Sequence, residues 1–110
     1  MKQLLVAAAR ISAEDAVADA VLDYEAELIE HHRTARVVIP VFMNEGDTLC
    51  ELFLGRGAID GALALPNTAG RRIVGSEAAV RELRERVRVL REQFSAPFDE
   101  DWYSVPARDD

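Results

Sequence analysis

Apolar residues recur at steps of three and four along two stretches of the chain, and this spacing is typical of amphipathic α-helices. In residues 13–31 a single apolar stripe is preceded by Ser12, placed as an N-cap, and Asp15 completes a variant of the capping box. The stripe consists of Ala13, Ala16, Val17, Ala20, Val21, Tyr24 and Leu28. We therefore expect a first helix over residues 13–31 with its apolar face buried.

Residues 77–94 carry the second helical pattern, which Ser76 is placed to cap. Its apolar positions form a narrow a/d seam of about two heptads. The seam consists of Val80, Leu83, Val87, Leu90 and Phe94. A self-standing coiled coil needs at least about three heptads. We therefore expect the seam to dock along a groove of this domain or of a partner subunit.

Between the two helical patterns, apolar runs at residues 36–43 and 48–54 flank the turn sequence Asn44-Glu45-Gly46-Asp47, which predicts a β-hairpin. Pro40 cannot donate a ladder hydrogen bond, so its strand should either lie at a sheet edge or turn that N–H position toward solvent or a bulge. Both faces of the first run are apolar, which indicates that both are covered. Residues 62–65 suggest a further short strand, and residues 3–8 suggest either another strand or an early helical turn. The predicted fold is α+β, a small antiparallel sheet containing the hairpin and packed with two main helices.

A chain of 110 residues is the size of one domain. We assign residues 1–96 to a single α+β domain and residues 97–110 to an acidic C-terminal tail. The apolar stretch at residues 4–9 is too short to span a membrane and lacks the features of a signal peptide. These features predict a cytoplasmic protein that does not bind a membrane.

The hairpin region resembles small uncharacterised α+β proteins of actinobacteria, in which an amphipathic helix precedes an Ile-Pro-Val strand, a turn and a second strand. The matching residues are Ile39-Pro40-Val41 and Glu51-Leu52-Phe53-Leu54-Gly55. One lysine against twelve arginines, with abundant alanine, fits a GC-rich bacterial genome. The resemblance implies a compact α+β domain and no particular activity.

Catalytic and metal-binding patterns are not found. Glu27 and His31 share a helix face next to His32, but a metal site needs three or four ligands, so helix-end electrostatics explain these histidines better. The only cysteine, Cys50, excludes an intrachain disulfide and alternates with apolar residues as a buried thiol would. Because no nucleophile, base and orienting group can be assembled, we expect no catalytic residues, no metal, no cofactor and no enzymatic activity.

A glycine-rich turn at residues 55–61 follows the second hairpin strand and is a candidate for anion binding. Under this hypothesis Arg56 and the backbone N–H groups of Gly57 to Gly61 meet a phosphate or another small anion. No Walker Lys-Ser/Thr pair follows, and Pro66 interrupts any long helix. A structural loop is therefore favoured, and a small anionic-ligand or phosphate-binding domain stays as an alternative.

The first helix carries acidic residues and no lysine or arginine. Four of the acidic residues, which we call the acidic ladder, follow one another at i,i+4 spacing: Asp15, Asp19, Asp23 and Glu27. Like charges at this spacing each cost about 0.2–0.5 kcal/mol in an exposed helix. Residues 71–92, in contrast, hold seven arginines against four glutamates. The ladder is therefore either a solvated face or a binding site for a basic partner.

The functional prediction is a non-enzymatic interaction or regulatory protein that binds a protein partner or itself, with a homodimer expected. The predicted partner-binding residues are the acidic ladder together with Val80, Leu83, Val87 and Leu90. A second alternative is an acidic inhibitor or nucleic-acid mimic, since a basic partner could be a surface that normally binds nucleic acid. Direct nucleic-acid binding is not expected, because a net charge of −7 opposes attraction to phosphates.

Overall fold

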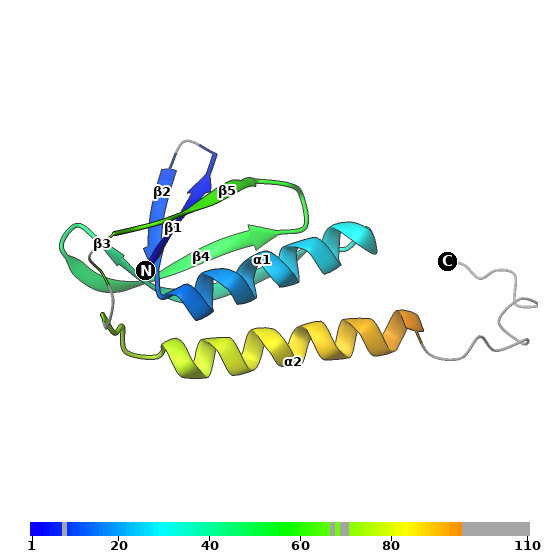
Figure 1. Ribbon diagram of the computed structural model, residues 1–110. Coiled ribbons are helices and arrows are strands. Elements are labelled where there is room, and N and C mark those ends of the chain that lie inside the picture. Colours follow the sequence, from blue (N-terminus) through cyan, green and yellow to red (C-terminus); the bar gives the residue numbers. More distant parts are fainter. Residues whose placement is uncertain (8, 67, 69–70, 96–110) are drawn as a thin grey trace, which may run out of the picture.

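The computed structural model describes residues 1–7, 9–66, 68 and 71–95, so the predicted acidic tail at 97–110 lies outside the described residues. The elements follow in the order β1 (Lys2–Val6), β2 (Ala9–Ala13), α1 (Asp15–Glu30), β3 (Ala35–Met43), β4 (Gly46–Leu54), β5 (Ile59–Ala64) and α2 (Ser76–Ser95). The strands form one five-stranded sheet in the order β4-β3-β2-β1-β5, and every pairing is antiparallel. The predicted α+β fold, with the hairpin and two main helices, is confirmed (Figure 1).

The hairpin pairs β3 with β4 along their whole length, from Ala35 opposite Leu54 to Met43 opposite Gly46. Its turn is shorter than the four residues expected, because β4 already begins at Gly46. Asn44 and Glu45 connect the strands with φ angles of 52° and 64°. Positive φ at both central residues is the signature of the tight turns whose twist matches that of the flanking strands.

β2 was not expected from the sequence, and α1 starts two residues later than predicted. Ser12 is a strand residue opposite Gln3, so the predicted N-cap at Ser12 is wrong. The N-cap is Glu14, without a side-chain capping bond, and α1 starts at Asp15. Strand pairing outweighs the cap here because it places Ile11 beside Leu4, and both side chains are buried.

β3 lies between β4 and β2 in the sheet, but most of its side toward β2 is unpaired, and this accommodates Pro40. Among the described residues β3 pairs with β2 only where Ser12 lies opposite Phe42. Near the start of β3 this second side is approached by α2, whose Arg86 Nη1 donates to the carbonyl oxygen of Arg36 at 3.3 Å. The missing N–H of Pro40 therefore costs no inter-strand hydrogen bond on this side.

The core is formed where α1 crosses the sheet and α2 packs alongside α1 (Figure 1). Leu83, Val87 and Leu90 of the predicted seam are buried in this core and Val80 packs against it. The seam thus docks within its own chain, the first of its two expected roles, and these four residues are not presented to a partner. No helix among the described residues is long and apolar enough to cross a membrane.

Ser76 does not cap α2 in the way expected from the sequence. It is the first residue of the helix, and the carbonyl of Gly75, where φ is +91°, accepts the hydrogen bond from the Ala79 N–H. The Ser76 hydroxyl is buried without a hydrogen-bond partner in the described part of the chain. Glycine takes the capping position because it adopts a positive φ without steric cost.

Candidate interaction surface

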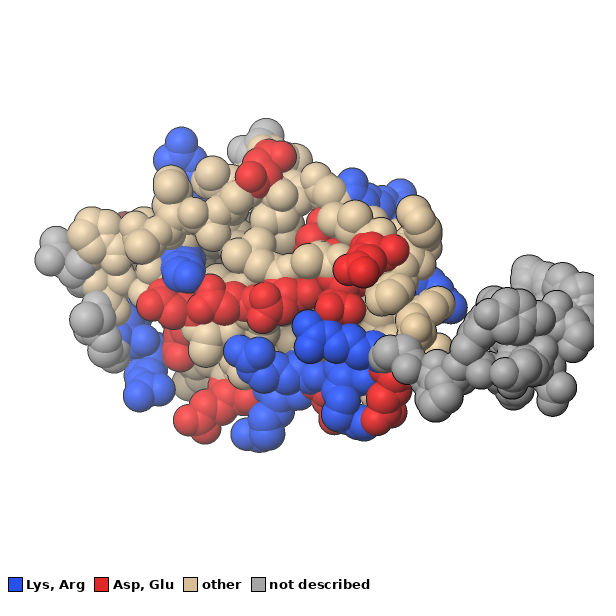
Figure 2. Space-filling view, turned by 45° about the vertical axis from the view of Figure 1, so that its right-hand side comes forward, with Lys and Arg blue, Asp and Glu red and all other residues tan. Residues whose placement is uncertain are grey.

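Each carboxylate of the acidic ladder has a cationic partner in the same chain. The pairs are Asp15 with the Met1 amino group at 3.1 Å, Asp19 with Lys2 at 2.7 Å, Asp23 with Arg84 at 3.8 Å and Glu27 with Arg91 at 2.8 Å. The hydrogen bond to Asp19 raises the pKa of Lys2. Figure 2 shows the outcome, a red band of carboxylates with blue side chains directly below it. The packing of α1 against α2 brings Asp23 and Glu27 to arginines of α2, whereas Asp15 and Asp19 are matched by the N-terminus and Lys2.

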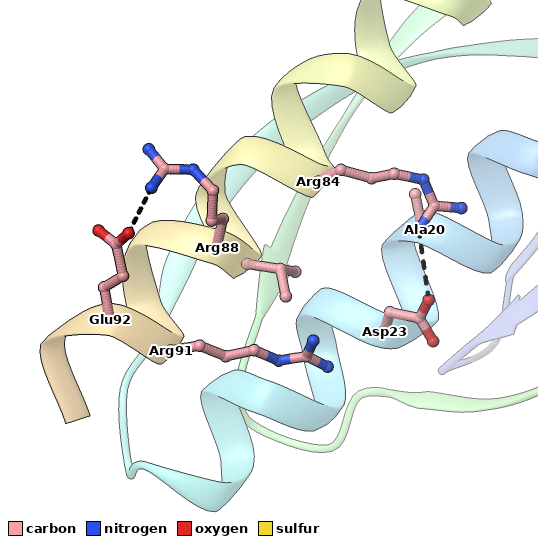
Figure 3. Close-up of a pocket in the computed structure, with 7 residues that line it drawn as sticks. Ala20, Asp23, Arg84, Arg88, Arg91 and Glu92 are labelled. Carbon is pink, nitrogen blue, oxygen red and sulfur yellow. Dashed lines mark hydrogen bonds and ion pairs between the residues drawn. The ribbon is translucent and has the colours of Figure 1, made fainter. Parts of the chain in front are cut away.

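A groove of about 350 Å³ lies between α1 and α2 and is lined by Arg84, Arg88 and Arg91 (Figure 3). Each of these arginines has a carboxylate partner, since Arg88 binds Glu92 at 2.6 Å and also Glu85. The hydrogen bond from Arg88 lowers the pKa of Glu85, and the same bond raises the pKa of Arg88. Because its cations are already paired, this groove offers no strong attraction to an external anion.

The glycine-rich turn does bind an anion, but the anion belongs to α1. Glu25, only 5% exposed, accepts hydrogen bonds from the N–H of Gly55 at 2.6 Å and of Gly57 at 3.0 Å. Both glycines have positive φ, and a Cβ on Gly55 would collide with the backbone carbonyl of Arg33. Arg56 is exposed and Gly61 lies within β5, so the predicted ligand residues do not converge. An external anion would have to displace Glu25 from its two donors.

His31, one of the two histidines predicted to act at the helix end, lies beside the end of α2. His31 stacks on Phe94 with ring centroids 4.4 Å apart and lies 3.6 Å from the carboxylate of Glu27. Arg33 approaches the same Phe94 ring at 5.1 Å. Within the described ranges no group of three or more His, Cys, Asp or Glu side chains is arranged to hold a metal ion. These contacts explain His31 as a packing residue between the two helices.

One face of the hairpin exposes large apolar side chains instead of covering them. Because side chains alternate along a strand, the register places Arg36 and Val38 of β3 on the same side as Leu49, Glu51 and Phe53 of β4. We call these five residues the hairpin outer face. Leu49 is 70% exposed, Phe53 62% and Val38 54%. The expectation that both faces of this strand are covered is therefore wrong at Val38.

The charged residues of the hairpin outer face neutralise each other. Arg36 Nε lies 3.1 Å from a carboxylate oxygen of Glu51, a diagonal pair across β3 and β4. At the turn end of β4, Asp47 lies 3.8 Å from Arg71, which also stacks over the Phe42 ring. The face is thus apolar and locally neutral on a molecule of net charge −7.

β4 is an outermost strand, and no strand of the described part of the chain pairs with its free side. Asp47, Thr48 and Leu49 are exposed in succession, so along this half of the strand both faces of the sheet are accessible to solvent. Cys50 follows, half-buried on the helix side, where burial raises the pKa of its thiol. The other outermost strand, β5, pairs with β1 through an irregular register, and such irregularities blunt an edge. The nine-residue β4 carries no proline, lysine or bulge of this kind.

The sequence pointed to an exposed edge but assigned it to the strand with Pro40. The signal for β4 was present, because Leu49 and Phe53 alternate with Cys50, Leu52 and Leu54. An apolar residue on the solvent side of a strand cannot be told from one on the core side until the register is known.

No family model, curated protein or solved structure matches this chain.

Proposed function

We propose that this protein is a non-enzymatic interaction or regulatory protein that acts through protein–protein contacts made by the hairpin outer face and the open β4 edge. The observation that carries the proposal is the exposure of Leu49, Phe53 and Val38, each more than half accessible on one side of one hairpin. Contiguous apolar surface next to an unpaired strand edge marks an interaction site in a folded protein. The proposal takes the protein to be cytoplasmic and assigns it no cofactor.

The proposed binding surface on the hairpin differs from the residues expected from the sequence. Leu83, Val87 and Leu90 are buried in the core of their own chain, and the acidic ladder is matched by cations of the same chain. A basic protein, or a surface that normally binds nucleic acid, would compete with those internal pairs. The acidic-mimic alternative and the anionic-ligand alternative therefore receive less support than contacts through the hairpin.

The test compares cross-linked partners in the native host for the parent chain and for the double variant Leu49→Thr/Phe53→Thr. Threonine preserves strand propensity while removing most of the apolar surface. The matched control is Leu63→Thr, which removes an exposed leucine from β5 instead. We expect the double variant to lose its cross-links, those to its own copies included, while the control retains them. If the double variant keeps the same cross-links as the parent, the hairpin is not the binding surface.

A further inference from the structure

We propose that the β4 edge binds β4 of a second copy of this chain, so that two five-stranded sheets join antiparallel about a two-fold axis at Cys50. This inference rests on the proposed function and names its partner. A C2 interface uses the same surface on both subunits, and an open edge strand supplies unpaired N–H and C=O groups for such a pairing. Exposure of Asp47, Thr48 and Leu49 leaves that side of β4 accessible.

Geometry restricts the registers that two copies of β4 can adopt. In a two-fold antiparallel pairing within one sheet, opposite residues must point to the same face, so the axis passes a residue opposite its own copy. With the axis at Cys50, Gly46 lies opposite Leu54 of the second copy. All nine residues of β4, Gly46–Leu54, are then paired. Any other centre leaves residues at one end of each strand without a partner.

Charge selects the same register. An axis at Glu51 sets this carboxylate opposite its own copy, and an axis at Leu49 sets Asp47 opposite Glu51. Like charges directly opposite each other destabilise a strand pair. With the axis at Cys50, Leu49 lies opposite Glu51 and Asp47 lies opposite Phe53, so no two charges face each other.

The surroundings of this register are neutral and apolar. Glu51 and Asp47 keep their own partners, Arg36 at 3.1 Å and Arg71 at 3.8 Å, which removes the local repulsion that a net charge of −7 would otherwise bring. The two copies of Leu49 become diagonal neighbours across the axis at about 7–8 Å. The two copies of Glu51 form the other diagonal, and each keeps its own Arg36 as partner. Pairing thus adds backbone hydrogen bonds and covers part of the hairpin outer face.

Cys50 reports on the register directly. Opposite residues of an antiparallel pair have Cα atoms about 4.5 or 5.5 Å apart, and both distances fall within the range that a disulfide spans. Treatment with diamide then links the two Cys50 thiols, which lose two protons and two electrons to the diamide as it is reduced to the hydrazine. Since Cys50 is the only cysteine of the chain, any disulfide-linked dimer passes through it.

The experiment uses the full chain in light scattering across a dilution series and in diamide cross-linking. We expect a mass that rises from 12.2 kDa toward twice that value with concentration. Leu49→Lys, which places a charge on the edge, should weaken dimerisation at least about tenfold. Leu63→Lys on β5 is the matched control and should dimerise like the parent. Diamide should give a reducible dimer with the parent chain and none with Cys50→Ser.

The variant Cys50→Ser/Thr48→Cys tests whether the two strands pair in the register centred on Cys50. Thr48 points to the same face as Cys50, but its copy is four residues away along the pairing, about 13 Å, beyond disulfide reach. Cross-linking of this variant as fast as the parent overturns the register at Cys50. A mass of 12.2 kDa at every concentration overturns the dimer. In that case, loss of cross-links to other proteins by Leu49→Thr/Phe53→Thr in the host would leave the proposed function standing, with a strand of another protein as partner.

Discussion

The carboxylate of Glu25 on α1 is held by the backbone N–H of Gly55, thirty residues further along the chain, at 2.6 Å, and by that of Gly57 at 3.0 Å. A buried carboxylate with two backbone donors ties the middle of α1 to the loop that leaves β4. It also fills the anion-binding site that the glycine-rich turn suggests from the sequence. The glycine-rich turn therefore holds a side chain of α1 in place of a ligand, and we call this contact the Glu25 clamp.

Removing the charge of Glu25 should therefore destabilise the fold. Glu25→Gln keeps the size of the side chain but offers one acceptor oxygen instead of two, so we expect a loss of about 1–3 kcal/mol in unfolding free energy by urea denaturation. Glu30→Gln, an exposed position on the same helix, serves as the control and should change stability little. Equal stability of the two variants would show that the clamp contributes nothing.

The tight turn of the hairpin predicts a stabilising substitution. Glu45 has a φ of 64°, and a residue with a Cβ pays for that conformation with steric strain. Glu45→Gly creates the Asn-Gly pair that such turns prefer, and we expect a gain of about 1 kcal/mol in unfolding free energy. Glu45→Ala removes the same charge and retains the Cβ, so it should give no gain. A gain of the same size with alanine would point to charge instead of conformation.

Substitution of Ser76 distinguishes a capping residue from a buried hydroxyl without a partner. A capping serine costs about 1 kcal/mol when replaced by alanine, whereas an unpaired buried hydroxyl costs little or nothing to remove. We expect Ser76→Ala to change the unfolding free energy by less than about 0.5 kcal/mol. The comparison variant is Glu14→Gln, because Glu14 accepts a hydrogen bond from the Ile73 N–H at 2.5 Å and should cost more. A loss of about 1 kcal/mol in the unfolding free energy of Ser76→Ala would show that Ser76 acts as a capping residue.

The helices and the hairpin were predictable because each buries one face, and burial of one face leaves a period in the sequence. β2 was not, since Ile11 and Ala13 alternate over too short a run and Ala13 also fits the helical stripe. Glu25 was counted with the acidic residues of α1, because nothing local shows that its partners come from residues 55–57. Pairings across the chain, such as Glu27 with Arg91 at a separation of 64 residues, depend on tertiary packing and leave no local signal.

The thiol of Cys50 should show the effect of burial in its pH dependence. Burial raises its pKa above the usual thiol value, because the thiolate loses hydration in the folded state. Alkylation by iodoacetamide requires the thiolate, so the rate profile of the folded chain should have its midpoint at higher pH than that of the chain unfolded in urea.

The same shift fixes the sign of its contribution to stability. A folded-state pKa above the unfolded value gives stability that is present below the unfolded thiol pKa and is lost as pH rises through the folded one. The parent chain should therefore lose more stability than Cys50→Ser between about pH 8 and pH 10. Coincident alkylation profiles for folded and unfolded chains would contradict the burial of this thiol.

Double-mutant cycles can compare two of the ion pairs that the acidic ladder makes with α2. Glu27 is 16% exposed and lies 2.8 Å from Arg91 Nε, whereas Asp23 is 60% exposed and lies 3.8 Å from Arg84. A shorter contact at a less exposed carboxylate is screened less by solvent. We expect a coupling of about 1 kcal/mol for Glu27→Gln with Arg91→Gln, and of about 0.2 kcal/mol for Asp23→Asn with Arg84→Gln.

Added salt should reduce the coupling of Asp23 with Arg84 more, relative to its own value, than that of Glu27 with Arg91, because exposed pairs are screened first. Zero coupling in both cycles would mean that the arginines of α2 do not offset the repulsion along α1 in solution. The ladder would then again be either a solvated face or a binding site for a basic partner.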